Sequence, residues 1–382
     1  MILHLSADIK FVEHIISQFE NVNFGNNHYV YISKKSNLPS LVNDYDKIDV
    51  IVKDTPAYFA LKEELFKYEA IILHSLQPIF FELILNIPKT VNVVWIIFGT
   101  DFYHTFMSYR RTLLLPQTRK MDLFTWSNIK HFLKPYYRKL IGKESNFTYV
   151  KRCLEHINYC ALSQEETYRQ LMETGFTKVK FLNFNYFSVE ETIGEELFDK
   201  SVNAENILIG NSACLYNNHF DAFELIKNIN LENRKIIVPL SYGYAYVRKK
   251  VIKKGKKLFK DHFFPLIKFI SRNEYNQILL SCSFVIMNHL RPQARGNIIT
   301  ALWLGAKVFL NEDTIFFKDF SKRGLSVFPI SSIKSYGEKA FSKINNDQRK
   351  HNRNILMNEF GKKVIIEQCK QLVDTIKTPK SI

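Results

Sequence analysis

The sequence predicts an α/β protein with two Rossmann-like domains that face a cleft. Two observations carry this prediction. Short apolar runs that suit buried parallel strands alternate with helical patterns along the chain, and the alternation restarts near residue 206. In each half, small and polar residues follow the first predicted strand, Ser6-Ala7-Asp8 in one case and Gly210-Asn211-Ser212 in the other. Open α/β sheets bind ligands at this edge, so each half offers a binding site.

A chain of 382 residues is long for one hydrophobic core. We expect an N-terminal domain over residues 1–190 and a C-terminal domain over residues 204–355. A C-terminal helix over residues 356–382 follows, and packing on the N-terminal domain is one option for it. Residues 189–203 are acidic and polar and lack apolar periodicity, which places the boundary there.

In the first half, the predicted strands cover residues 1–5, 29–32, 50–52, 70–73, 91–98, 157–162 and 179–184. Helical spacing of apolar residues marks 11–19, 57–68 and 80–85. A further helix follows residue 162, and Ser163 with Glu166 would form its capping box. In the second half, the predicted strands are 206–209, 235–239, 267–270, 284–287 and 307–310. The predicted helices are 221–229, 272–280, 298–304 and 354–376, with a helix-to-strand passage at 316–328.

The stretch from residue 284 to residue 313 has the most specific chemistry. A strand leads into a loop with Arg291 and Arg295, and Gly296 opens a helix that ends at Gly305. A helix N-terminus attracts a diphosphate, and glycine lets the ligand approach the backbone. Glu312, after the next strand, stands where a carboxylate can bind ribose hydroxyls. The alternative is an ordinary βαβ unit with solvated arginines.

The net charge of +16 favours an acidic partner: nucleic acid, an anionic membrane surface or a phosphate-bearing substrate. Basic residues interleave with aromatic residues and leucine from Phe102 to Arg152. This composition suits an interfacial helix on anionic lipid, single-stranded nucleic acid, or a solvated face over an ordinary core.

The five scattered cysteines contain no CxxC pair, which argues against structural zinc and a disulfide framework. The N-terminus lacks the pattern of a signal peptide, and the apolar runs are too short to span a bilayer. We therefore expect a cytosolic protein. Asp44-Tyr45-Asp46 is formally a DxD metal motif, but it precedes a predicted strand, and Asn43 beside it favours a turn.

Asp101 lies just past the carboxyl end of the strand predicted at 91–98. An ionisable side chain in this position is a candidate for a site, and Asp101 can equally cap the following helix.

Short blocks in a fixed order give the chain a resemblance to a known family. The blocks are His4 and Asp8; Trp95, Gly99, Asp101 and Tyr103; Gly210-Asn211-Ser212 with Asn218 and His219; Val238-Pro239 with Tyr242; and Arg291, Gln293 and Gly296 with the helix that ends at Gly305. The chain resembles the bacterial N-acetylfucosaminyltransferases of the 4-alpha-L-fucosyltransferase type. These enzymes move 4-acetamido-4,6-dideoxygalactose from its TDP-sugar to a polyprenyl-diphosphate-linked glycan in enterobacterial common antigen and O-antigen synthesis.

The chain departs from the family pattern in two places. The loop from Ala213 to Tyr216 is less polar than in the family, and Ser241-Tyr242-Gly243-Tyr244 replaces a Gly-Tyr-Pro type sequence. Both segments belong to the expected donor side, so the identity of the sugar stays open.

The resemblance implies a GT-B glycosyltransferase that inverts the anomeric centre and needs no metal and no cofactor. It implies that Asp101 or, second, Asp8 is the catalytic base, with His4 and His74 as outside candidates. The implied donor-binding residues are Gly210, Asn211, Ser212, Asn218, His219, Tyr242, Arg291, Gln293, Gly296, Asn297 and Glu312.

The implied partners are a TDP-sugar, a lipid-linked acceptor and the inner leaflet of the membrane. The stretch from Phe102 to Arg152 would meet that leaflet, which makes the protein peripheral on the cytoplasmic face of the inner membrane, with no nucleic-acid partner. Two alternatives remain open: an epimerase of the GT-B kind, and a basic nucleic-acid-binding protein.

Overall fold

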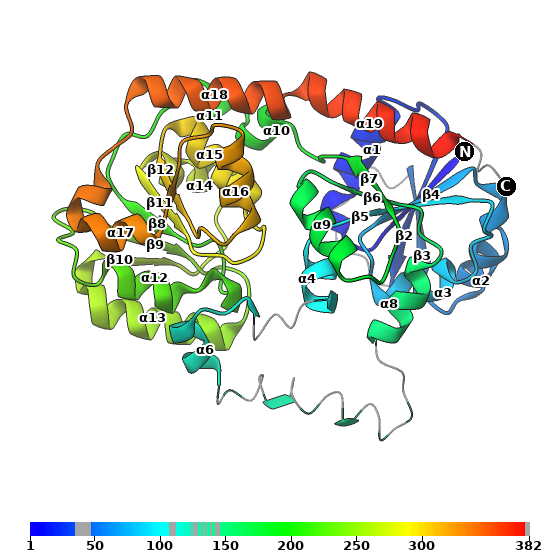
Figure 1. The fold of residues 1–382 in the computed structure, drawn as a ribbon, viewed down its shortest axis with the longest axis horizontal. Coiled ribbons are helices and arrows are strands. Elements are labelled where there is room, and N and C mark those ends of the chain that lie inside the picture. Colours follow the sequence, from blue (N-terminus) through cyan, green and yellow to red (C-terminus); the bar gives the residue numbers. More distant parts are fainter. Residues whose placement is uncertain are drawn as a thin grey trace. The chain divides into compact units, whose positions relative to one another are not determined.

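The computed structural model describes residues 1–34, 47–106, 112–123 and 146–378, together with 125, 129, 130, 133, 136, 137, 140 and 142. The chain forms two compact units (Figure 1). Unit 1 holds residues 1–107, 133–188 and 362–382, and unit 2 holds residues 108–132 and 189–361. Each unit is an α/β layer structure around a parallel sheet, so the predicted fold class of two Rossmann-like domains is confirmed.

Unit 1 contains a seven-stranded parallel sheet in the order β3-β2-β1-β4-β5-β6-β7. Its strands are β1 (Ile2–Ser6), β2 (Asn27–Ser33), β3 (Ile48–Val52), β4 (Ala70–His74), β5 (Asn92–Ile96), β6 (Tyr159–Leu162) and β7 (Lys180–Asn183). Its helices are α1 (Val12–Glu20), α2 (Pro56–Glu63), α3 (Phe81–Ile84), α4 (Thr100–Phe106), α8 (Asn146–Leu154), α9 (Glu165–Glu173) and α19 (Lys362–Lys377), with 3-10 turns η1 (Ile9–Phe11), η3 (Leu65–Lys67) and η4 (Pro78–Phe80). The strand order reverses beside β1, so the switch point of this sheet lies between β1 and β4.

Unit 2 contains a six-stranded parallel sheet in the order β10-β9-β8-β11-β12-β13. Its strands are β8 (Ile207–Ile209), β9 (Ile236–Pro239), β10 (Phe263–Leu266), β11 (Phe284–Met287), β12 (Lys307–Leu310) and β13 (Val327–Pro329). Its helices are α6 (Pro116–Asp122), α10 (Val189–Ile193), α11 (Glu195–Phe198), α12 (His219–Ile226), α13 (Ala245–Phe259), α14 (Arg272–Leu280), α15 (Arg295–Leu304), α16 (Ile315–Lys322), α17 (Ser331–Tyr336) and α18 (Asn346–Phe360), with 3-10 turns η5 (Leu215–Asn217), η6 (Lys260–His262) and η7 (Gly337–Phe341). The switch point lies between β8 and β11.

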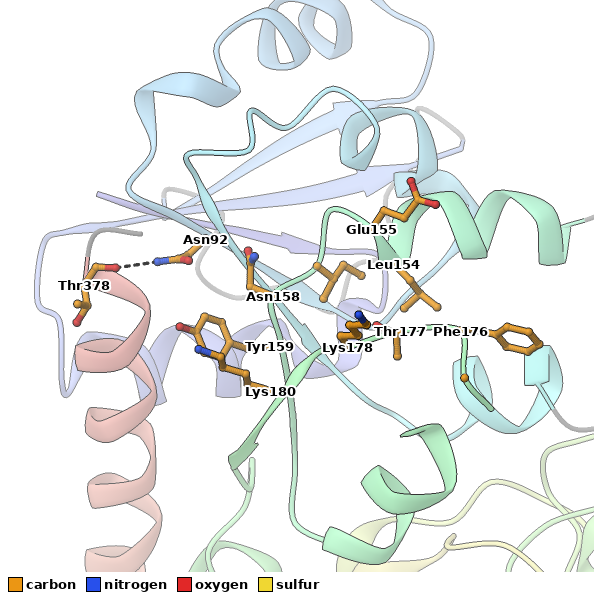
Figure 2. A pocket seen from close by; sticks show the side chains of 12 residues that line it. Asn92, Leu154, Glu155, Asn158, Tyr159, Phe176, Thr177, Lys178, Lys180 and Thr378 are labelled. Atoms are coloured by element: carbon orange, nitrogen blue, oxygen red, sulfur yellow. Dashed lines mark hydrogen bonds between the residues drawn. The ribbon is translucent and has the colours of Figure 1, made fainter. Parts of the chain in front are cut away.

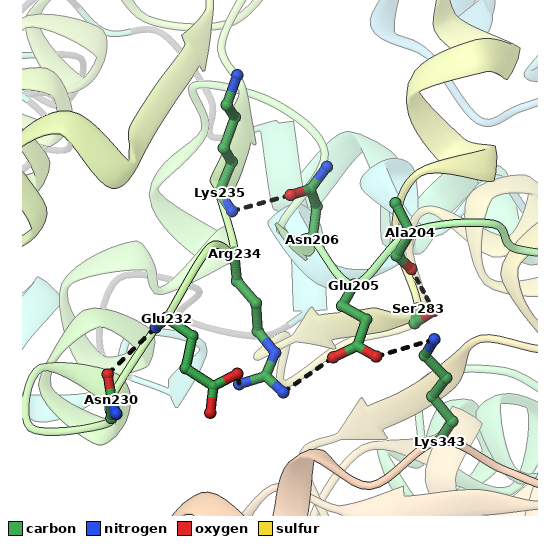
Figure 3. Close-up of polar contacts among 9 residues, drawn as sticks. All are labelled: Ala204, Glu205, Asn206, Asn230, Glu232, Arg234, Lys235, Ser283 and Lys343. Carbon is green, nitrogen blue, oxygen red and sulfur yellow. Dashed lines mark hydrogen bonds and ion pairs between the residues drawn. The ribbon is translucent and has the colours of Figure 1, made fainter.

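The central strands of unit 2 are buried on both faces, which explains their continuous apolar sequences. Phe284 and Ile286 of β11 join the core under α12 and α13, whereas Val285 and Met287 join the core under α15 and α18. The amino edge of this sheet is held by Glu205, which pairs with Arg234 at 3.0 Å and with Lys343 at 2.9 Å (Figure 3).

The structure divides the chain differently from the expected domains. Residues 108–132 belong to unit 2, where Leu114 is part of the buried core. The second stretch of unit 2 begins at Val189. Val189, Ile193 and Leu197 follow helical spacing and are buried in the core with α15 and α18. The expected boundary segment therefore forms part of the core of unit 2. The glutamates between its apolar residues hide their helical spacing in the sequence.

The helix expected over residues 354–376 is two helices. Helix α18 ends at Phe360 and stays in unit 2, and α19 begins at Lys362 and packs in unit 1 on β5, β7 and α1. The break lies at Gly361, where an added Cβ would stand 2.4 Å from the Met357 carbonyl oxygen.

Two local predictions were wrong. The strand expected at residues 267–270 lies earlier, at Phe263–Leu266, because only that register pairs with β9. The capping box expected from Ser163 is absent, since Gln164 is the N-cap of α9 and makes no side-chain capping bond.

Candidate functional site

The loops that follow β8 and β11 meet at the switch point of unit 2. Gly210 ends β8 with φ of 66°, and an added Cβ would lie 2.8 Å from both Asn217 Oδ1 and His219 Nε2. Only glycine fits this turn. The loop after β11 reaches the same place, because His289 Nε2 lies 2.9 Å from Asn217 Oδ1.

Asn211 connects two other predicted donor-binding residues, Tyr242 and Gln293. Its side-chain amide donates to the Tyr242 hydroxyl at 2.9 Å, and its Oδ1 accepts from Gln293 Nε2 at 3.2 Å. Gln293 Oε1 is buried and has no hydrogen-bond partner. Since Tyr242 is 56% exposed, the cluster reaches the protein surface, and the buried Gln293 Oε1 is an unsatisfied acceptor beneath it, next to the Gly210 turn.

Asn217 holds this loop together, although it is not among the donor-binding residues expected from the sequence. Its Oδ1 accepts from the Asn211 backbone N–H at 2.9 Å. Its side-chain N–H donates to the Ser212 carbonyl at 2.9 Å and to Ser212 Oγ at 3.0 Å. Asn217 is fully buried, so it shapes the loop and Ser212 is engaged by it. The only sequence signal was its place beside the family-like Asn218 and His219.

Asn218, one of the expected donor-binding residues, has a structural role. Its backbone is left-handed, with φ of 50°. Its side chain accepts from the Leu115 N–H at 2.9 Å and donates to the Leu113 carbonyl at 3.2 Å and the Asn288 carbonyl at 2.9 Å. These bonds hold residues 113–115 against the loops that follow β8 and β11 in unit 2. Asp221 assists by accepting from the Thr118 N–H and hydroxyl, at 2.9 and 2.7 Å, at the start of α6.

His219 is a neutral, buried imidazole. Burial lowers its pKa to about 3, and its Nε2 has no hydrogen-bond partner. It packs against the Gly210 turn. Because the ring is neutral, it cannot supply a positive charge near neutral pH.

Arg291 lies on the ring of Tyr216, with its guanidinium carbon 4.6 Å from the ring centroid. Only 6% of the residue is exposed. Arg295, which the sequence placed beside a diphosphate, instead lies over the Phe360 ring at 4.5 Å, and burial lowers its pKa to about 10. Arg291 is thus the arginine that remains beside the switch point.

The N-terminus of α15 carries no side-chain cap. Ala294 is the N-cap, with φ of 57°, and its side chain accepts no bond from the helix. Gly296 is exposed, and an added Cβ would meet only Thr192 Cγ2 at 3.7 Å. Asn297 donates to the Tyr275 hydroxyl at 3.1 Å. The backbone at this terminus is open to an anion.

Glu312 follows β12, as predicted from the sequence. One of its oxygens accepts from the Ser331 N–H at 3.1 Å, at the first residue of α17. Among the residues that the structure describes, no hydrogen bond joins Glu312 to Asn211, Tyr242 or Gln293, so its place near a ribose is a proposal.

In unit 1, Asp101 is saturated with hydrogen bonds. Its Oδ2 accepts from Trp95 Nε1–H at 2.7 Å and from the Leu76 N–H at 2.9 Å. Its Oδ1 accepts from the N–H groups of Phe98, at 3.2 Å, and Phe102, at 3.0 Å. Burial raises the pKa of the carboxyl, and these bonds oppose the rise. A carboxylate with four N–H donors is a structural hub and is poorly suited to take a proton.

Asp8 lies two residues past β1 and is partly buried. Its N–H donates to Ser6 Oγ at 3.4 Å, within a turn at the switch point of unit 1. This position fits a residue that meets a substrate better than the position of Asp101 does.

His4 and His74 form one buried pair. His4 Nδ1 is hydrogen-bonded to His74 Nε2 at 3.1 Å, and His74 Nδ1 to the Tyr186 hydroxyl at 2.6 Å. Burial lowers the pKa of His4 to about 3 and lowers that of His74 as well. Both imidazoles are buried core residues whose ring nitrogens are already hydrogen-bonded to protein groups.

The DxD candidate, Asp44-Tyr45-Asp46, lies outside the described residues. Much of the basic stretch from Phe102 to Arg152 also lies outside them, including Arg110, Arg111 and Lys134. No helix within the described ranges is long and apolar enough to cross a membrane. Among the same residues, no three His, Cys, Asp or Glu side chains are grouped so that they could hold a metal ion.

A pocket of about 880 Å³ lies at the amino edge of the unit 1 sheet, opposite the carboxyl edge that Asp8 follows (Figure 2). Asn92, Tyr159 and Lys180, at the amino ends of β5, β6 and β7, line it. Asn92 also donates to the carbonyls of Ile376, at 2.8 Å, and Thr378, at 3.0 Å, at the end of α19. None of the predicted site residues lines this pocket.

Comparison with known proteins agrees with the resemblance. Residues 166–348 match the family model of 4-alpha-L-fucosyltransferase, glycosyl transferase group 56. No curated protein matches the chain.

Several solved structures share the fold. One is described as trehalose-6-phosphate from E. coli bound with UDP-2-fluoro glucose, with 8% identity over 99% of this chain and 100% of that chain and a TM-score of 0.62. HepE from Anabaena in complex with UDP-glucose has 11% identity over 98% and 99%, with a TM-score of 0.62. WaaG, a glycosyltransferase involved in lipopolysaccharide biosynthesis, has 10% identity over 99% and 100%, with a TM-score of 0.56.

At these identities the likeness to solved structures concerns the fold, and the family match concerns the chemistry. The two findings agree with each other and with the two parallel sheets. The chain is therefore a glycosyltransferase with the GT-B fold, and over residues 166–348 it matches the 4-alpha-L-fucosyltransferase family, glycosyl transferase group 56.

Proposed function

We propose that the protein transfers a deoxyamino sugar, 4-acetamido-4,6-dideoxygalactose or a similar sugar, from a TDP-sugar to a polyprenyl-diphosphate-linked glycan. The transfer inverts the anomeric centre without a metal and belongs to surface-polysaccharide synthesis. One observation carries the donor side of the proposal. The loops after β8 and β11 join at the switch point of unit 2 through the bond between Gln293 and Asn211, which links two segments that both resemble the family.

The donor diphosphate binds the open N-terminus of α15. There the backbone N–H groups and the helix dipole face the anion, Gly296 allows close approach, and Arg291 contributes a positive charge. Tyr242, Gln293 and Asn297 contact the sugar and nucleoside, and Glu312 accepts from the ribose hydroxyls. The complexes of HepE with UDP-glucose and of the E. coli protein with UDP-2-fluoro glucose support a nucleotide-sugar donor.

Asp8 is the base in this proposal. An acceptor hydroxyl attacks the anomeric carbon while Asp8 takes its proton, and TDP leaves with its charge stabilised by Arg291 and α15. The choice of Asp8 over Asp101 rests on the four N–H donors that already occupy the Asp101 carboxylate.

The segment from Phe102 to Arg152 binds the cytoplasmic face of the inner membrane in this proposal. Its described part exposes large apolar side chains: Leu123, Ile129, Leu133, Tyr136, Tyr137 and Leu140, each between 39% and 85% exposed. Together with the basic residues of the segment they suit an anionic bilayer surface, where the lipid-linked acceptor resides.

Calorimetry with TDP, UDP, GDP and a random single-stranded oligonucleotide tests the donor side. We expect micromolar binding of TDP that weakens at least tenfold in Glu312→Ala and Arg291→Ala. Thermal unfolding of both variants controls for a loss of fold, because Arg291 is buried. Salt-sensitive binding of the oligonucleotide, with no nucleotide binding, would instead support a nucleic-acid-binding protein.

A second assay separates a transferase from an epimerase of the same fold. The transferase releases TDP at a rate that rises with the concentration of a polyprenyl-diphosphate-linked glycan. Release that ignores this acceptor contradicts the proposal.

A further inference from the structure

Ser75 combines two unfavourable features at the switch point of unit 1. It follows β4 and has φ of 95°, a left-handed conformation that is strained for every residue except glycine. Its hydroxyl is buried and has no hydrogen-bond partner. A glycine at this position would remove both penalties, so the sequence retains a serine where the backbone favours glycine.

The neighbours of Ser75 hold its backbone in place. On one side, the His74 side chain is bonded to His4 and Tyr186. On the other side, the Leu76 N–H donates to Asp101 at 2.9 Å, and Trp95 fixes that carboxylate. A strained conformation persists only where the surroundings determine it in this way, and such residues concentrate at functional sites.

The position of Ser75 points to the proposed acceptor side. Ser6 at the end of β1 pairs with His74 at the end of β4, so the residues just past these strands, Asp8 and Ser75, leave the same edge next to each other. Doubly wound sheets bind their ligands at this edge, beside the switch point. A serine oxygen can be redirected by rotation about χ1 among its three staggered positions, without a change in the backbone.

We infer that Ser75 binds a hydroxyl group of the acceptor sugar and so positions it for the base. A neutral hydroxyl that both donates and accepts suits a sugar hydroxyl, whereas a lipid diphosphate would call for cationic groups. The inference rests on the proposed function and adds a residue that recognises the acceptor sugar. Ser75 acts as a positioning residue, and the proton still passes to Asp8.

The test compares Ser75→Gly and Ser75→Ala with the wild type. The donor is TDP-4-acetamido-4,6-dideoxygalactose, and the acceptor probe is a farnesyl-diphosphate-linked disaccharide. Both transfer to the probe and hydrolysis of the donor by water are measured. We expect the acceptor KM to rise at least tenfold and the ratio of transfer to hydrolysis to fall at least tenfold in both variants. Ser75→Gly should also unfold at a higher temperature than the wild type, because the strain is gone.

Asp54→Gly provides the matched control. Asp54 is another residue of unit 1 with a left-handed backbone, φ of 65°, and it is exposed beyond the edge strand β3. We expect it to gain stability and to keep the acceptor KM of the wild type. If Ser75→Gly is more stable and transfers as well as the wild type, the inference is wrong while the proposed function stands. If the wild type releases no TDP with any acceptor, the proposed function fails and takes the inference with it.

Discussion

The indole N–H of Trp95 donates to Asp101 Oδ2 at 2.7 Å, so the residue that the sequence favoured as catalytic base is bound by the strand before it. We expect Asp101→Asn to lower the free energy of unfolding by about 2–4 kcal/mol, because an amide N–H₂ group would replace one of two acceptor oxygens. Urea unfolding followed by tryptophan fluorescence measures the loss.

Asp8→Asn is the counterpart of this variant. It should lower kcat about 10²- to 10⁴-fold with a much smaller effect on unfolding. A stable but inactive Asp101→Asn, together with an active Asp8→Asn, would return the role of base to Asp101.

The protein should lose stability as the pH falls below about 6.5. Four buried histidines, His4, His74, His219 and His289, have pKa values lowered by burial, to about 3 for His4 and His219. Between the folded and unfolded pKa values only the unfolded chain binds the proton. The stabilisation from His4 and His219 is therefore complete above pH 6.5 and declines toward pH 3, by about 1.4 kcal/mol per pH unit for each, and His74 and His289 act in the same direction.

Thermal unfolding at several pH values measures this dependence. His219→Gln should flatten it. A pH-independent midpoint between 6.5 and 4 would contradict neutral burial. The raised pKa of Asp101 acts in the opposite direction, favouring the folded state in acid, and so makes the decline less steep.

Two glycines of unit 2 should respond in opposite ways to alanine. Gly210→Ala places a Cβ 2.8 Å from Asn217 and His219 at a left-handed backbone, and we expect a loss of about 2 kcal/mol or more. Gly296→Ala meets nothing closer than 3.7 Å, and alanine favours a helix over glycine by about 0.5–1 kcal/mol. Gly296→Ala should therefore fold at least as well as the wild type yet bind TDP more weakly, as calorimetry would show. Unchanged TDP affinity would remove the diphosphate from the N-terminus of α15.

The link between α6 and α12 should depend on Asp221. Its carboxylate accepts bonds from the start of α6, and Asp221→Ala should cost about 1–2 kcal/mol of local stability, as the loss of an N-cap does. Hydrogen exchange of residues 115–122 should accelerate. Glu224→Ala, on the same helix but in surface pairs with Lys227 and Lys254, should leave this exchange unchanged. Equal exchange in both variants would show that the Asp221 carboxylate does not hold the segment, which would leave the Asn218 bonds and the packing of Leu114.

Gln293→Leu should separate folding from donor recognition. The unsatisfied Oε1 is removed along with the 3.2 Å bond to Asn211, so the free energy of unfolding should change by less than about 1 kcal/mol. Binding of the TDP-sugar should weaken at least tenfold relative to free TDP, because the amide is expected to contact the sugar. Gln371→Leu, on the surface of α19, is the control. Equal losses for TDP and the TDP-sugar would place the amide beside the nucleotide instead.

The sequence predicted regular elements well wherever local pattern decides. Strands β11 and β12 were predicted to the residue, since uninterrupted apolar runs have one reasonable register. It failed where distant partners decide. Nothing local to Asp101 shows that the Leu76 N–H, 25 residues earlier, donates to its carboxylate, and nothing local to Asn218 shows that it binds Leu115, 103 residues away. Ser75 had no motif to mark it, because its significance is a backbone angle.

The chain passes between the two units at residues 107/108, 132/133, 188/189 and 361/362, so neither unit is a contiguous stretch of the gene. The last of these passages returns Cys369, Leu372, Val373 and Ile376 to the core that contains Ile2 and Val12. During synthesis, the first domain to leave the ribosome therefore cannot complete its core until the last helix has been made. A fragment that stops at residue 188 lacks that helix, and one that starts at residue 189 lacks α6, so cutting the gene in half yields two incomplete domains. The core of unit 1 therefore includes residues from both ends of its sequence, and the sixteen-residue helix α19 completes it.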